Sequence, residues 1–97
     1  MADDGIDELL LGVWRKNRPV ALERARLLAA LGAADEELRA TAHKLAGSLG
    51  MYGLARASDL ARQVDDLVVD GALADGRRPD VAAAAAELVA ALEASPS

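Results

Sequence analysis

The residue best suited to chemistry in this chain is its only histidine, His43. Near neutral pH an imidazole is largely uncharged and keeps a ring-nitrogen lone pair, so it can act as a nucleophile without a strong base beside it. Glycines follow it four, seven and ten positions later, as Gly47, Gly50 and Gly53. On a helix, the first two of these glycines lie one and two turns beyond the histidine on nearly the same side. The pattern indicates a nucleophile that a large partner can approach.

The segment around His43 predicts an amphipathic helix from about Asp35 to Tyr52. The apolar stripe that should face the core consists of Leu38, Ala42, Leu45, Leu49 and Tyr52. His43 lies about 140° from the direction of that stripe, so we expect it on the solvent side. The other residues on the histidine's side of the helix are Glu36, Arg39, Ala40, Gly47 and Gly50.

Gly47 and Gly50 lie inside this predicted helix, where glycine is an unfavourable residue. Glycine in a helix interior costs about 1 kcal/mol relative to alanine, and alanine occurs 23 times in the chain. A methyl group at Gly47 or Gly50 would obstruct either a partner that approaches His43 or a helix packed behind the glycines. The plainer alternative is that His43 is an ordinary surface residue, and Gly53 alone is explained as a joint between helices.

The sequence offers little for other kinds of chemistry. Cysteine is absent and one histidine cannot form a zinc site, so we expect no metal site, disulfide or thiolate nucleophile. No second histidine is present to serve as the base for a serine nucleophile. Four acids lack the alternation of a calcium loop and should form a solvated helix face: Asp59, Asp65, Asp66 and Asp70.

The composition favours a small all-α domain in which residues 1–97 form one unit. Alanine and leucine dominate and phenylalanine is absent, which suits helices better than strands. The net charge of −5 opposes nucleic acid or an anionic membrane as a partner. No apolar run is long enough to span a membrane and the N-terminus lacks the basic start of a signal peptide, so we expect a cytoplasmic protein. We expect a monomer, although a second apolar stripe on the helix at 19–31 leaves dimerisation open.

Proline and glycine divide the chain into five predicted helices. Proline disfavours helical geometry in the preceding residue and suits the first turn of a helix, so one helix should stop near Asn17 and the next should start at Pro19. Gly32 should close that second helix. The predicted helices cover about 4–16, 19–31, 35–52, 54–70 and 79–94. Because short connections favour antiparallel neighbours, 19–94 should form an up-down-up-down four-helix bundle, with 4–16 as an additional N-terminal helix.

The stretch AHKLAGSLGMYGL, residues 42–54, resembles the signature of histidine-containing phosphotransfer (HPt) domains. The resemblance implies that His43 accepts a phosphoryl group from a receiver-domain aspartate and passes it to another. It also implies a carrier without kinase activity and without a cofactor of its own, with Mg²⁺ supplied by the receiver. The implied partners are response-regulator receiver domains and a hybrid sensor histidine kinase.

The chain departs from the pattern of many HPt domains at one position. Where those domains place a lysine three residues after the histidine, this chain has Ala46, and its lysine is Lys44. We therefore expect Lys44 to stabilise the phosphoryl group, with Arg39 as a second candidate. The residues expected to dock a partner are Glu36, Ala40, Gly47, Gly50 and Met51. The alternative function is a helical scaffold or adaptor that binds a receiver or another signalling partner without being phosphorylated.

Overall fold

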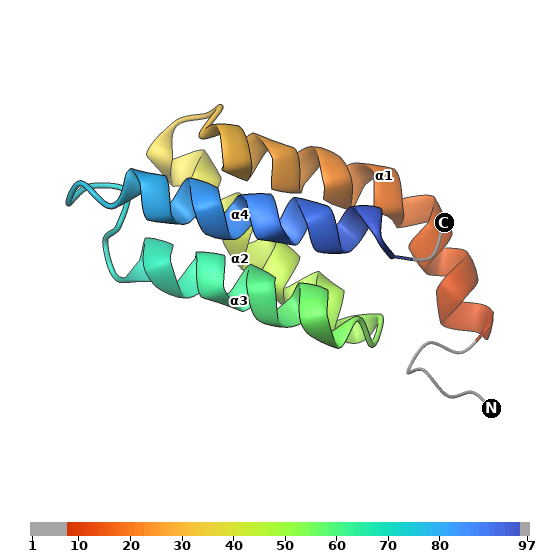
Figure 1. The fold of residues 1–97 in the computed structure, drawn as a ribbon. Coiled ribbons are helices and arrows are strands. Elements are labelled where there is room, and N and C mark those ends of the chain that lie inside the picture. The colour runs from red at the N-terminus through yellow and green to blue at the C-terminus, as the bar shows by residue number, and fades with distance from the viewer. Residues whose placement is uncertain (1–7, 96–97) are drawn as a thin grey trace.

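The computed structural model describes residues 8–95, and within them the chain is all-helical with no strand. Its four helices form a bundle (Figure 1). They are α1 (Glu8–Ala30), α2 (Asp35–Met51), α3 (Ala55–Val69) and α4 (Arg78–Glu93).

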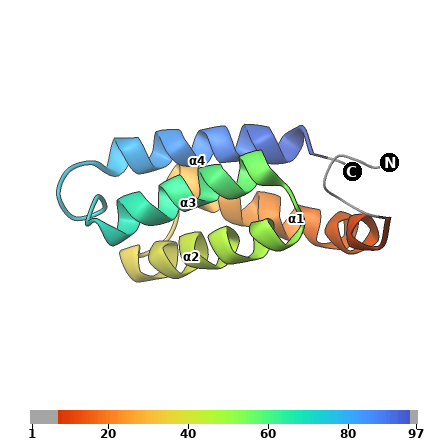
Figure 2. The same cartoon turned by 90° about the horizontal axis from the view of Figure 1, so that it is seen from below.

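The four helices pack in a ring in which each touches two others. Close backbone contacts join α1 to α2 and α4, and join α3 to α2 and α4. In Figure 1 the chain turns back after each helix, so that α2 and α3 lie side by side, and Figure 2 shows the same pairing from below. The ring therefore leaves the outer faces of α2 and α3 open on one side of the bundle.

The core lies along the centre of this ring. It combines large aliphatic side chains with alanines, which let the helices approach closely. The largest fully buried side chains are Trp14, Leu28, Leu38, Leu45, Leu49, Leu60, Leu88, Leu92, Val64 and Val81. Tyr52, expected in the core, is half-buried at its edge.

The predicted break near Asn17 and the additional N-terminal helix are wrong for the described residues. One helix, α1, continues from Glu8 to Ala30 with Pro19 inside it. Proline removes one backbone donor and usually kinks or ends a helix. Contacts on the N-terminal side of Pro19 must therefore hold the helix in place. The start of the predicted first helix, residues 4–7, lies outside the described residues.

Three side chains just before Pro19 tie this half of α1 to the rest of the bundle. Trp14 is fully buried, and its ring centroid lies 5.1 Å from that of Tyr52. The Asn17 Nδ2 donates to the Tyr52 hydroxyl oxygen at 2.9 Å. The Arg18 Nη2 donates to the carbonyl oxygen of Glu93 at 2.9 Å. Tertiary contacts with the ends of α2 and α4 thus outweigh the local effect of proline.

The end of α1 also differs from its prediction, because Leu31 and not Gly32 takes the left-handed conformation. Leu31 has φ +50°, its N–H donates to the Leu28 carbonyl at 3.1 Å, and the Gly32 N–H donates to the Leu27 carbonyl at 3.0 Å. This is the hydrogen-bond pattern of a Schellman motif. The same pattern ends α3, where Gly71 adopts φ +93°.

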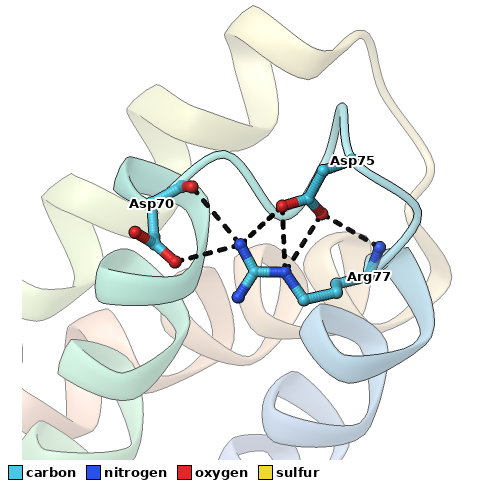
Figure 3. Close-up of polar contacts among 3 residues, drawn as sticks. All are labelled: Asp70, Asp75 and Arg77. Atoms are coloured by element: carbon cyan, nitrogen blue, oxygen red, sulfur yellow. Dashed lines mark hydrogen bonds and ion pairs between the residues drawn. The ribbon is translucent and has the colours of Figure 1, made fainter.

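The two remaining connections contain the expected glycines and a loop. Gly53, at φ +72°, lies in the short connection between α2 and α3, which confirms it as a helix joint. The longer connection between α3 and α4 is closed by Arg77, which contacts Asp70 and Asp75 (Figure 3). Pro79 follows in the first turn of α4, as predicted.

Candidate functional site

The helix α2 presents His43 to solvent. Asp35, Glu36 and Glu37 place negative charge at its first turn, which favours the start of a helix. The buried residues of α2 are Leu38, Ala42, Leu45 and Leu49. The His43 side chain lies outside this buried stripe and is 82% exposed, as the helical spacing predicts.

The other residues predicted for the site also lie at the surface of α2. Met51 is 75% exposed, one of several large apolar side chains at the surface. The remaining exposed residues are Glu36, Arg39, Ala40, Lys44, Gly47 and Gly50. Within residues 8–95, neither Lys44 nor Arg39 forms an ion pair.

The space around Gly47 and Gly50 shows whether a helix packed behind them, or room for a partner beside His43, accounts for these glycines. A Cβ atom built on Gly47 would meet nothing within 4 Å, so no helix packs behind it. A Cβ atom on Gly50 would meet only the Ser58 hydroxyl oxygen, at an ordinary contact distance of 3.4 Å. Packing inside the described part of the chain therefore does not require glycine at position 47.

The imidazole of His43 contacts a carboxylate on the neighbouring helix. Its Nδ1 lies 3.4 Å from Oδ2 of Asp65, which α3 supplies. The Asp65 side chain is only 17% exposed, so its prediction as part of a solvated face is wrong. The other three acids of that prediction, Asp59, Asp66 and Asp70, are exposed.

This contact orients the ring. When Nδ1 carries the proton, Asp65 accepts a long hydrogen bond from it, and the lone pair of Nε2 is left free. The other oxygen of Asp65, Oδ1, is buried without a hydrogen-bond partner in the described part of the protein. A buried acceptor without a partner lowers the stability of the fold, and such groups need an explanation. In this protein the destabilising group is Asp65, and its other oxygen contacts the only histidine of the sequence.

An open hollow of about 530 Å³ lies beside His43 between α2 and α3. It is lined by His43, Ala46, Gly47, Gly50, Met51, Arg62, Asp65 and Asp66. Lys44 and Arg39, the cations predicted to meet a phosphoryl group, are not among these residues. The structure thus brings His43 together with the two glycines and Met51, and adds three charged side chains from α3.

Sequence reasoning missed Asp65 and Arg62 as neighbours of His43. A signal for Asp65 was present, because it lies four residues after Ala61 and three before Val68, and both of these are buried. A carboxylate on a buried stripe of a helix points inward. The position of Arg62 follows only from how α3 lies against α2.

Two other kinds of site are not found in the described part of the protein. No group of three or more histidine, cysteine, aspartate or glutamate side chains is arranged to hold a metal ion within residues 8–95. In the same range no helix is long and apolar enough to cross a membrane.

The fold and site together define a small helical module that carries one exposed, oriented histidine. A family model, the Hpt domain, matches residues 10–96, and the chain belongs to this family. Hpt domains are the histidine phosphotransfer modules of phosphorelays and interact with receiver domains and kinases of two-component systems. The family match confirms the resemblance found in residues 42–54. Searches among curated proteins and among solved structures found no match.

Proposed function

We propose that His43 is the phosphoryl acceptor of this phosphotransfer domain. The observation that carries the proposal is that the only histidine is exposed beside Gly47, where nothing in the described structure fills the space. An aspartyl phosphate sits on the surface of a whole receiver domain, so the acceptor must be reachable by a large partner. A strip of α2 without side chains meets this requirement.

In the transfer step the Nε2 lone pair attacks the phosphorus of the receiver's aspartyl phosphate. The N–P bond forms while the P–O bond to the aspartyl group breaks, and the aspartate leaves with that electron pair as a carboxylate. The imidazole gains positive charge and keeps its proton on Nδ1, next to Asp65 Oδ2. Asp65 is thus a positioning residue that holds the ring in the tautomer with Nε2 free and favours the charged product.

The rest of the chemistry comes from the partner. Phosphoryl transfer depends mainly on positioning and charge neutralisation, and a Mg²⁺ ion held by the receiver supplies part of the latter. The chain itself needs no cofactor and acts as a carrier, not as a kinase. Since α2 and α3 of one chain form the whole site, one copy is sufficient.

The surface around His43 docks the receiver. Besides Gly47 and Gly50 it includes Glu36 and Ala40 toward the start of α2, and Met51 at its end. Met51 provides an exposed apolar contact, the type of side chain that adapts to more than one partner surface. This suits a carrier that meets both a donor and an acceptor receiver.

The test is phosphoryl transfer from a phosphorylated receiver domain to the wild-type chain and to His43→Gln. We expect acid-labile, base-stable phosphate on the wild type and none on the variant. The helix content and Tm of the variant should match the wild type, because an exposed side chain contributes little to the core. Arg15→Gln, an exposed change on α1, is the matched control and should accept phosphate normally.

The alternative is a scaffold that binds a receiver without being phosphorylated. It would give a different result in the same experiment. The wild-type chain would bind the receiver, remain unphosphorylated, and bind equally well as His43→Gln.

A further inference from the structure

The hollow beside His43 contains an unusual set of charges. Apart from the histidine, its charged lining residues are Arg62, Asp65 and Asp66, which all belong to α3. Arg62 is the only lysine or arginine of residues 8–95 that lines this hollow. Lys44 and Arg39, the cations expected from the sequence, lie outside it.

A phosphoryl group on His43 would enter an electrostatically unfavourable place without a cation. It carries a charge of about −1.5 to −2 near neutral pH. Two carboxylates, Asp65 and Asp66, line the same hollow, and Asp65 Oδ2 lies 3.4 Å from Nδ1, across the ring from the Nε2 that would carry the phosphoryl group. Carboxylates that share an open hollow with a phosphoryl group repel it, so a positive group on the same side would favour the phosphorylated state.

Arg62 lies in the right place to be that group. It comes three and four residues before the two aspartates, and residues at these spacings share one face of a helix. Because α2 and α3 are joined by the short connection at 52–54, the beginning of α3 lies opposite the end of α2 (Figure 1). Arg62, at the middle of α3, lines this hollow together with Gly47 and Gly50, and it also lines a neighbouring one with Gly50 and Ser58.

Arg62 is also free to move toward a phosphoryl group. Its side chain is 65% exposed, and its only ion pair in the described structure joins Nη1 to Asp59 Oδ1 at 4.0 Å. An exposed pair at that distance contributes little and does not fix the side chain. The planar guanidinium can donate two parallel hydrogen bonds to phosphate oxygens, which a lysine cannot do.

From this arrangement we propose that Arg62 on α3, and not Lys44 or Arg39 on α2, is the side chain that binds the phosphoryl group on His43. The proposal rests on His43 being the acceptor. It makes the phosphate site a contact between two helices, with the nucleophile on α2 and the cation on α3.

The test uses the full chain phosphorylated on histidine with phosphoramidate, a small phosphoryl donor, so that it does not depend on a receiver. The titration midpoint of the phosphoryl group is measured by ³¹P NMR in wild type, Arg62→Gln, Arg62→Lys and Lys44→Gln. A neighbouring cation favours the dianion, so we expect Arg62→Gln to raise the midpoint by about half a pH unit or more. Arg62→Lys should restore part of this shift, and Lys44→Gln should leave the midpoint unchanged.

A second readout is the rate of transfer from a phosphorylated receiver, which should fall about tenfold in Arg62→Gln, equivalent to about 1.4 kcal/mol. Arg56→Gln, an exposed arginine of α3 that does not line the hollow, is the matched control. An unchanged midpoint in Arg62→Gln, or an equal shift in Lys44→Gln, would overturn the assignment of Arg62 even if transfer to His43 is normal. If the midpoint depends on Arg62 but no receiver phosphorylates the wild-type chain, Arg62 stands as the phosphate ligand and the relay function fails.

Discussion

Two clusters of charged residues on this bundle are organised in opposite ways. In the loop between α3 and α4, Arg77 donates from Nε and Nη2 to the carboxylate of Asp75, and from Nη2 to Asp70 Oδ2 at 3.0 Å (Figure 3). The backbone N–H of Arg77 also donates to Asp75. These hydrogen bonds hold the pKa of Asp75 below its ordinary value and raise the pKa of Arg77.

The cluster around His43 is left incomplete. Asp65 has one oxygen at 3.4 Å from the imidazole and one buried oxygen without a partner in the described structure. Arg62 reaches its own partner only at 4.0 Å. Charges that satisfy one another stabilise a loop, whereas charges held apart around an open hollow are available to a ligand. The difference supports assigning the Arg77 cluster to the fold and the His43 cluster to the proposed transfer.

The sharpest test of this contrast is Asp65→Leu. We expect transfer to His43 to slow by roughly 10- to 100-fold, as when other histidines lose the carboxylate that fixes their tautomer. The Tm should stay the same or rise, because the change removes a buried acceptor that lacks a partner. Glu87→Leu is the control and should leave transfer unchanged, since Glu87 is an exposed acid of α4 outside the hollow. A fall in Tm together with unchanged transfer would show that Asp65 serves the fold.

A smaller effect is expected from Gly47→Leu, which fills the space beside His43. The variant should fold with a slightly higher Tm, because leucine is a better helix former than glycine. Transfer should slow by about tenfold through weaker receiver binding, equivalent to about 1.4 kcal/mol. Gly12→Leu on α1 is matched, because a Cβ atom there also meets nothing within 4 Å, and it should transfer normally. Equal rates for both variants would mean that the receiver does not dock over Gly47.

Arg77→Gln should lower the Tm and leave the transfer rate unchanged, whereas Asp65→Leu should slow transfer without lowering the Tm. Removing the guanidinium leaves Asp70 and Asp75 side by side without a cation, so the Tm should fall slightly. The phosphoryl transfer rate should not change, because Arg77 lies outside the hollow. Thermal unfolding followed by circular dichroism, combined with the transfer assay, measures both quantities. A slowed transfer would refute the separation of the two clusters.

The smallest effect concerns pH. The folded-state pKa of Asp75 is below its ordinary value of 3.8, mainly because of the side-chain hydrogen bonds from Arg77. Its contribution to stability is therefore fully present above that value and is lost as the pH falls through the lower, folded pKa. The Tm difference between wild type and Arg77→Gln should accordingly shrink as the pH falls below about 4. If the Tm difference does not change with pH in this range, the interaction of Asp75 with Arg77 does not contribute to stability.

The face of α2 could be predicted from sequence because it depends on local periodicity. Leu38 and Leu45 set the buried stripe, and the position of His43 opposite that stripe follows from helix geometry. The roles of Asp65 and Arg62 could not be derived in the same way, since they depend on the position of α3 against α2. The part of the site on α2 could thus be predicted from local periodicity, whereas the part on α3 depends on how the two helices pack.

The errors in the predicted fold have a similar cause. Proline disfavours a continuous helix locally, but α1 continues through Pro19, and the contact of Trp14 with Tyr52, across 38 positions of sequence, holds its N-terminal half against the bundle. At the end of the same helix, Leu31 adopts a conformation that favours glycine. Its half-buried side chain packs against the core, and that burial offsets the backbone strain.

The short connection at 52–54 affects the order in which the contacts of the bundle form. The contact of His43 with Asp65 closes a loop of 22 residues, whereas the contact of Arg18 with Glu93 closes one of 75. The entropy lost on closing a loop grows with its length, and contacts of small sequence separation form quickly. The proposed phosphoryl acceptor and its positioning carboxylate therefore belong to a single helical hairpin. The contacts between α1 and α4 have much larger sequence separations, so we expect the α2–α3 hairpin that carries His43 to form before them.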